Sequence, residues 1–144
     1  MSNATQGENK SKGELIGELR GKSVTTTIEE TTPFGVRISS NHIAQFTGKY
    51  NASHMETDNS FLSGDGTNQY DGKAVQNTIE GDVVFVTSRG NGHATSLTTR
   101  AWEGEVVFMT RSQKLAWLNT TKGWIEGTTN YATGEYQGKI YAQK

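Results

Sequence analysis

The sequence predicts an all-β protein: a closed antiparallel (up-and-down) β-barrel of about eight strands. Three observations favour this class. The 144 residues include 17 glycines, a single proline and many threonines, and the β-branched threonine suits strands better than helices. No segment shows a convincing 3.6-residue apolar period, because glycines interrupt the best candidate, 14–20. Finally, a turn-plus-strand pattern recurs at a fixed spacing in the second half of the chain.

The recurring pattern is Glu-Gly followed by a short apolar segment. Residues 80–87 (EGDVVFVT) reappear as 103–110 (EGEVVFMT) and, more weakly, as 126–133 (EGTTNYAT), each 23 residues further on. Two strands of roughly 8–9 residues with two tight connections fill such a period, so we interpret each period as one hairpin of a meander. Glu80, Glu103 and Glu126 are then solvated turn residues. The alternative is chance recurrence of a common turn-plus-strand pattern.

Glycine-rich and polar turn signals divide the chain into strands. The segment 14–20 is interpreted as an irregular lead-in or a first strand, and one strand of the less regular first half as bulged or split. Residues 88–93 (SRGNGH) look like a phosphate-binding loop, but a strand instead of a helix follows, which indicates a hairpin turn. The candidate strands are 22–31, 36–50, 52–62, 67–80, 82–89, 93–103, 105–111, 114–121, 124–132 and 135–142.

Length and composition fit a single barrel domain over residues 13–144, preceded by a disordered polar tail over residues 1–12. The chain has no cysteine, which excludes disulfides and thiolate chemistry and fits the cytoplasm. The net charge is −1 with scattered lysines and arginines, so nucleic acid is not an expected partner. The start lacks the apolar segment of a signal peptide, and no apolar run is long enough to span a membrane.

Some strands are apolar on both faces. Val83 and Phe85 alternate with Val84 and Val86, so the two pairs point to opposite sides. A monomeric barrel needs only one apolar face per strand. We therefore expect a homo-oligomer, a dimer or a trimer.

The first candidate site is the run His54, Glu56 and Asp58. Residues two apart on a strand share a face and lie about 6.5–7 Å apart. His42, Phe46 and Tyr50 share that parity if the strand continues. An imidazole with carboxylates inside a barrel suits a divalent metal or an acid–base pair. The alternative is a solvent-facing stripe, with Met55 and Phe61 on the core side.

The second candidate pairs Arg100 with Trp102, which share a strand face. Inside a barrel they could hold a carboxylate or a polarised carbonyl. Alternatively, Arg100 is exposed and its stem covers Trp102. A third group consists of aromatic side chains, which suit a flat apolar ligand or simply the core and an interface. Its members are Trp117, Trp124, Tyr131, Tyr136 and Tyr141.

The end of the chain resembles the closing hairpin of allene oxide cyclase-like barrels, many bacterial members of which have no known function. The resemblance rests on 123–127 (GWIEG) and 132–139 (ATGEYQGK), where a Thr-Gly-x-Tyr-x-Gly turn joins two strands, and on a second Thr-Gly-x-Tyr at 47–50. It implies an eight-stranded barrel, an oligomer and an internal pocket, and it carries no catalytic residue across. Avidin-like and lipocalin-like barrels share the strand pattern, but their ligand-binding motifs are absent.

We therefore expect an internal pocket for an apolar or aromatic small molecule, with cofactor-independent cyclisation, isomerisation or elimination as the candidate chemistry. No metal site and no cofactor are predicted. Two alternatives remain open: a non-catalytic ligand-binding barrel, and an oligomeric structural or interaction protein with a filled interior. The predicted catalytic residues are His54, Glu56 and Arg100, and the predicted ligand-binding residues are Trp102, Trp117 and Tyr50.

Overall fold

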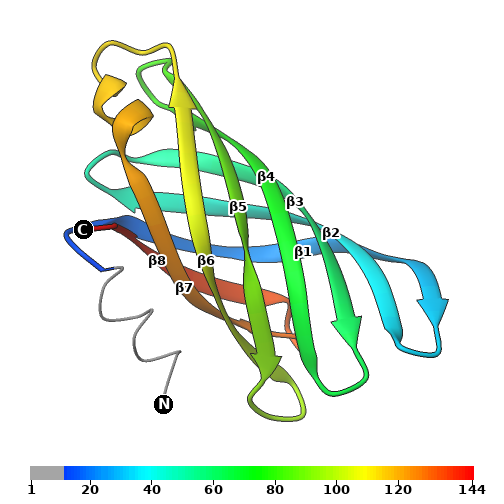
Figure 1. Cartoon of the computed structure of the whole chain (residues 1–144). Coiled ribbons are helices and arrows are strands. Elements are labelled where there is room, and N and C mark those ends of the chain that lie inside the picture. Colours follow the sequence, from blue (N-terminus) through cyan, green and yellow to red (C-terminus); the bar gives the residue numbers. More distant parts are fainter. Residues whose placement is uncertain (1–11) are drawn as a thin grey trace.

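The computed structural model describes residues 12–144, which form a closed eight-stranded barrel (Figure 1). Every strand is antiparallel to its neighbours in the chain, and the last strand pairs with the first. This confirms the predicted class and topology. The elements are β1 (Leu15–Thr32), β2 (Gly35–Gly48), β3 (Ala52–Ser63), β4 (Thr67–Thr78), β5 (Val83–Ala94), β6 (Thr99–Thr110), the 3-10 helix η1 (Ala116–Thr120), β7 (Lys122–Asn130) and β8 (Glu135–Ala142).

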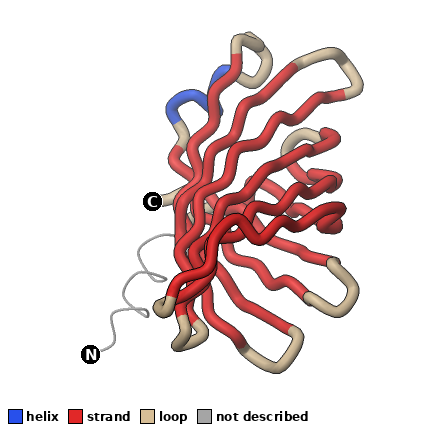
Figure 2. Tube along the Cα trace, turned by 90° about the vertical axis from the view of Figure 1, so that its right-hand side faces the viewer, coloured by secondary structure: helices blue, strands red, loops and turns tan. Residues whose placement is uncertain are grey.

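The two ends of the barrel differ. At the end that carries η1, the start of β1 and the C-terminus, apolar side chains fill the interior, among them Phe46 and Leu118, both fully buried. The opposite end carries the β1–β2, β3–β4 and β5–β6 hairpins and spreads open (Figures 1 and 2). We call these the closed end and the mouth. The β1–β2 hairpin reaches furthest, and residues 24–34 are all exposed.

The first strand of the structure begins earlier than the predicted strand 22–31. It starts at Leu15, so the segment 14–20 belongs to the strand instead of forming a lead-in. Its pairing with β2 shifts register between Ser23 and Thr25 and again between Ile28 and Glu30, which agrees with a bulged strand in the first half. The predicted tail, residues 1–12, lies outside the described residues except for Lys12, whose Nζ is 3.1 Å from Glu126 Oε1.

The predictions for residues 82–121 were wrong in detail. The glycines at 90–92 do not form a turn: β5 runs through them, and the chain reverses between Ala94 and Thr99. Gly90 lies opposite Gly104 on β6, and a Cβ on Gly90 would collide with the Glu103 carbonyl and lie 2.6 Å from the Gly104 Cα. These glycines therefore permit close strand approach. The predicted strand 114–121 is instead a loop that contains η1.

The 23-residue repeat does not mark repeated hairpins. Strands β3 to β6 are each 12 residues long, longer than the period allows. The first copy lies in a turn and the start of β5, and the second in the latter half of β6, so the two run in opposite directions. Only Glu80 precedes a turn glycine, Gly81 with φ +93°. Glu103 and Glu126 face each other within β6 and β7, which corrects their assignment as turn residues.

Gly90→Ala is expected to lower the free energy of unfolding by about 1–3 kcal/mol, because the new methyl group meets backbone atoms that cannot rotate away. Urea unfolding followed by tryptophan fluorescence measures the change. Gly64→Ala is the matched control, since the nearest atom to its Cβ position is 3.9 Å away. Equal stability of the two variants would contradict the close-packing role of Gly90.

The outer wall carries an apolar row across five strands. Register pairs Ile43 with Met55, Met55 with Val75, Val75 with Phe85, and Phe85 with Met109. All but Val75 are more than half exposed. Val84 and Val86 point inward and are buried, so the predicted two-faced apolar pattern of β5 is confirmed. The residues described include no helix long and apolar enough to cross a membrane.

Candidate functional site

The barrel encloses a cavity of about 660 Å³ between the packed closed end and the mouth. Its floor includes Val86, Val106 and Ile140, and its upper wall includes Leu62 and residues 131–134 of the β7–β8 turn. Polar and titratable side chains from β2, β3, β4 and β6 project into this space. The interior is thus hollow and contains both apolar and ionisable groups.

The run His54, Glu56 and Asp58 faces this cavity. Met55, between them, is 58% exposed on the outer wall, so the solvent-facing alternative for the run is wrong. Strand register places His42 of β2 directly opposite Glu56. Two histidines and two carboxyl groups therefore meet on one patch of the inner wall.

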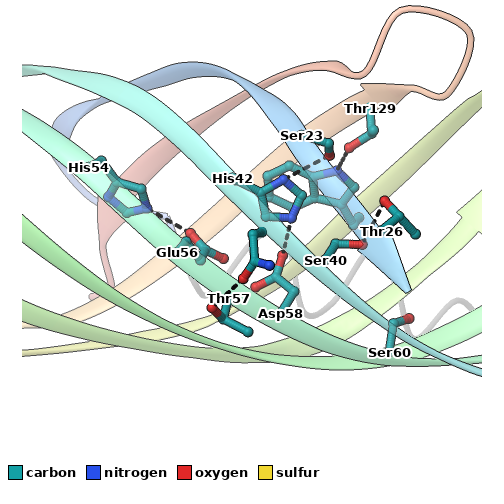
Figure 3. Close-up of polar contacts among 12 residues, drawn as sticks. Ser23, Thr26, Ser40, His42, His54, Glu56, Thr57, Asp58, Ser60 and Thr129 are labelled. Atoms are coloured by element: carbon teal, nitrogen blue, oxygen red, sulfur yellow. Dashed lines mark hydrogen bonds and ion pairs between the residues drawn. The ribbon is translucent and has the colours of Figure 1, made fainter. Parts of the chain in front are cut away.

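His42 and Asp58 form the central contact of this patch (Figure 3). His42 Nε2 is 3.1 Å from Asp58 Oδ2, and His42 Nδ1 is 2.9 Å from Ser23 Oγ. Burial alone would lower the pKa of His42, but the hydrogen bond and charge of Asp58, helped by Glu56, raise that pKa above its usual value. His42 is thereby held in one orientation from both sides of its ring.

Asp58 is the most perturbed carboxyl group of the site. Burial raises the pKa of Asp58 to about 8; Glu56 contributes in the same direction, whereas His42 opposes the shift. Asp58 Oδ1 has no hydrogen-bond donor in the described part of the chain, and the Glu56 carboxyl can bond to it only when one of the two is protonated. Opposite them on β4, Gly72 makes the space: a Cβ there would collide with Asp58 Oδ1 and lie 2.7 Å from Glu56 Oε2.

His54 supports the patch from below. Gln76 Nε2 lies 3.1 Å from His54 Nδ1, and an amide nitrogen can only donate, so the His54 proton is on Nε2. That nitrogen donates to Glu56 Oε1 at 2.7 Å. Burial lowers the pKa of His54 to about 4, so the ring is neutral at physiological pH. The series of hydrogen bonds continues to Tyr50, whose hydroxyl donates to Gln76 Oε1 at 2.5 Å.

Tyr50 itself does not line the cavity. It is buried at the closed end, with its ring centroid 4.7 Å from that of Phe46. The structure therefore places this predicted ligand-binding residue away from the cavity, because β2 ends at Gly48 and the chain turns there. Tyr50 instead begins the hydrogen-bond chain that holds His54.

Arg100 and Trp102 both face the cavity, so the surface-exposed alternative for them is wrong. Arg100 is only 6% exposed, and its Nη1 donates to Asn68 Oδ1 at 2.7 Å. Trp102 Nε1 donates to Thr129 Oγ1 at 2.9 Å. The edge of its indole ring lies against Gly127 and Gly138, where a Cβ would collide with it. The two glycines therefore make room for the indole, which lines the cavity.

Trp117 is a second predicted ligand-binding residue that the structure places away from the cavity. The segment 114–121 is not a strand, and in it Leu115 and Leu118 are the residues that turn into the closed end. Trp117 is 38% exposed on η1, with the Lys49 ammonium 6.0 Å from its ring centroid. It lies outside the cavity.

Several residues of the site were not among those predicted. His42 shares the parity of the His54 run, but only the β2–β3 register shows that it meets Asp58. No sequence pattern marked Tyr70 or Ser23, and Ser88 stood out only as the first residue of the segment 88–93, which was interpreted as a hairpin turn. Within residues 12–144, five buried side-chain polar atoms make no hydrogen bond, and all belong to residues that line the cavity: Asp58 Oδ1, Tyr70 Oη, Ser88 Oγ, Arg100 Nε and Tyr136 Oη.

The histidines and carboxyl groups do not form a metal site in the described residues, because no three of them are placed to share an ion.

No protein-family model matches the chain, and no curated protein is detectably similar to it.

Solved structures resemble the barrel at low sequence identity. A protein of unknown function from Clostridium acetobutylicum ATCC 824 is 12% identical, with a TM-score of 0.81 over 91% of this chain and 98% of that one. A beta-barrel like protein from Acinetobacter baumannii AYE is 16% identical, with a TM-score of 0.74 over 91% and 94%. An enzyme from Penicillium herquei is 19% identical, with a TM-score of 0.70 over 92% and 96%. These similarities establish a small β-barrel fold. None of these descriptions mentions allene oxide cyclases, so that resemblance stays a prediction.

Proposed function

We propose that this barrel is a cofactor-independent enzyme that moves a proton on an apolar or aromatic small molecule, with Asp58 as the acid–base group. One observation carries the proposal: inside the cavity, Asp58 has a pKa of about 8, one oxygen held by His42 and the other without a donor. Acid–base catalysis is most effective when the pKa of the group lies near the working pH. The likeness to an enzyme barrel and to allene oxide cyclase-like barrels is compatible with this class of reaction.

The proposed step is a proton transfer between carbon and Asp58. The ionised Asp58 accepts a proton at Oδ1 as a substrate C–H bond breaks, and the electron pair passes into the conjugated system of the substrate. Return of the proton to another carbon completes an isomerisation. In a cyclisation, the carbanion attacks an electrophilic carbon of the same molecule to form the ring bond, and the electron pair displaced by this attack takes the proton back from Asp58. In an elimination, the leaving group departs with its bonding electron pair, and Asp58 then passes the proton to it or to water. His42 stabilises the carboxylate at Oδ2, and Ser23 orients His42.

Glu56 and His54, predicted as catalytic residues, act through Asp58 in this scheme. The negative charge of Glu56 makes Asp58 more basic, and neutral His54 fixes Glu56 by donating to Oε1. His54 is therefore proposed as a positioning residue, since its ring makes both of its hydrogen bonds within the wall.

The proposal is tested by hydrogen–deuterium exchange on carbon. Incubating 1-tetralone or 4-phenylbutan-2-one with the protein in D₂O should replace the acidic α-protons by deuterium faster than buffer alone, as followed by NMR. A rate no higher than that of buffer for a whole panel of aryl ketones that bind would refute a catalytic role. It would favour the non-catalytic binding barrel, which the five unbonded polar atoms of the cavity support independently of any reaction. The third alternative, a filled interior, is disfavoured by the cavity.

We further propose that the apolar outer row is the contact between copies of this chain, as a dimer or a trimer. Phe85→Lys should then shift the sedimentation coefficient to that of a monomer at micromolar concentration, because a lysine charge in an apolar contact is costly. Phe34→Lys is the matched control, at an exposed phenylalanine in the β1–β2 turn. A monomeric wild-type protein would contradict this proposal. We also propose that the protein is cytoplasmic, which the lack of cysteine supports.

A further inference from the structure

The least satisfied group in the cavity is Arg100. Its side chain is among the most buried charged groups, and no carboxylate lies within ion-pairing distance of it in residues 12–144. One edge of the guanidinium donates to Asn68 through Nη1. On the other edge, Nε is buried without a partner, and Nη2 makes no hydrogen bond to the described residues. A buried charge in this state is costly unless an anion joins it.

The geometry points to an aromatic carboxylate as the ligand: we propose that Arg100 binds the carboxylate of a planar aromatic molecule through Nε and Nη2. The free edge of a guanidinium presents two parallel N–H groups, which match the two oxygens of a carboxylate. This inference rests on the proposed function, because it supplies the substrate class for the same cavity.

Charge fixes which way such a ligand enters. The carboxyl groups of Glu56 and Asp58 line the cavity further from the mouth than Ser60, and the charge of Glu56 disfavours an anion there. Arg100 is joined through Asn68 to Ser60, which follows Asp58 on the same face of β3, roughly 7 Å further along the strand. The carboxylate therefore sits beside Arg100 near the mouth, and the far end of the molecule reaches Asp58.

Aromatic side chains line the space between these two ends. The ring of Trp102 lies 6.3 Å from that of Tyr70 and 6.4 Å from that of Tyr136, centroid to centroid. The guanidinium of Arg100 lies 5.9 Å from the centroid of Tyr131 in the β7–β8 turn. These rings pack edge-on or tilted against one another and form one aromatic surface of the cavity, which suits an aromatic body. The unbonded hydroxyls of Tyr70 and Tyr136 can in addition bond to oxygens on its rim.

The test compares 2-naphthoate with its neutral isostere 2-naphthamide by isothermal titration calorimetry at pH 7.5. The wild-type protein is expected to bind naphthoate at least tenfold more tightly. Arg100→Met should remove this preference and weaken naphthoate binding 10- to 100-fold, while naphthamide binding stays within about twofold. Arg100→Lys keeps the positive charge but lacks the two parallel N–H donors of the guanidinium. It should bind naphthoate about tenfold more weakly than the wild type.

The control is Arg111→Met, which removes one positive charge from an exposed residue beyond the end of β6. Its naphthoate affinity should equal that of the wild type. Equal binding of naphthoate and naphthamide by the wild type would overturn the inference, as would unchanged naphthoate affinity in Arg100→Lys and Arg100→Met. Without ligand, the melting temperature of Arg100→Met is expected to match or exceed that of the wild type, because the substitution removes a buried unpaired charge. A marked fall in melting temperature would mean that Arg100 has a structural role, and it would also count against the inference.

Failure here is distinguishable from failure of the proposed function. Deuterium exchange into neutral aryl ketones depends on Asp58 and not on Arg100. Exchange without a carboxylate preference would leave the proton-transfer proposal standing and remove the substrate class. A carboxylate preference without exchange would do the reverse.

Discussion

Replacing Asp58 by asparagine is expected to lower the rate of α-proton exchange in aryl ketones by about 10²–10⁴-fold, the usual contribution of a positioned acid–base group. Asparagine has nearly the same shape and can still accept a hydrogen bond from His42 Nε2. It cannot take a proton from carbon. The substitution therefore removes the proton-transfer group and leaves the contacts of the wall in place. NMR in D₂O measures the loss.

Asp71→Asn is the matched control, because Asp71 is exposed on the outer face of β4. Its exchange rate should equal that of the wild type. Gly72→Ala gives a second, independent perturbation: its methyl group pushes the Asp58 and Glu56 carboxyls apart without changing either side chain, and the rate should fall at least tenfold. Exchange that survives in Asp58→Asn would show that the proton moves elsewhere.

The second large effect is a pH dependence of stability. The pKa of Asp58 is about 8 in the folded protein and 3.8 in the unfolded chain, so the folded state binds the proton more tightly. The resulting stability is complete below pH 3.8 and is lost as the pH rises through the folded pKa of about 8. His42, whose pKa is also raised, acts in the same direction. His54, whose pKa is lowered to about 4, acts in the opposite direction, but only between pH 4 and 6.5.

Measurements between pH 6.5 and 9 therefore isolate Asp58 and His42. Over this window the free energy of unfolding of the wild type should fall by about 2 kcal/mol, since one pKa unit corresponds to about 1.4 kcal/mol. Asp58→Asn should show a nearly flat profile, because it removes both the carboxyl and the main cause of the raised pKa of His42. Urea unfolding at four pH values is sufficient. Parallel profiles for the two proteins would contradict the raised pKa.

Much of the fold could be read from local patterns. The predicted strands 36–50, 52–62, 67–80 and 135–142 agree with the structure to within two residues, because polar turns bound them. Alternation also placed His54, Glu56 and Asp58 on one face, and Arg100 with Trp102 on another. An alternating pattern does not say which face is inside, so the solvent-exposed alternatives stayed open. They were removed only by the closure of the sheet.

The features of the fold and site that local patterns could not predict depend on contacts between strands. Gly90 and Gly104 read as turn residues, yet they lie opposite each other where two curved strands approach closely. His42 meets Asp58 because of the β2–β3 register, which no single strand encodes. Trp117 read as a strand residue because η1 is too short to have a helical period. The missed members of the site thus come from pairing across the barrel wall.

The pairing of β1 with β8 has a consequence for how the barrel assembles. Every other pairing joins strands that are neighbours in the chain and can form early as hairpins, whereas this seam must bring the two ends of the chain together. Until the seam closes, β1 and β8 are open edges, and Asp58, Glu56 and Arg100 are still in contact with bulk water. The free-energy cost of desolvating these charged groups therefore arises when β1 and β8 pair. The groups proposed to do the chemistry are thus those that oppose the last step of folding.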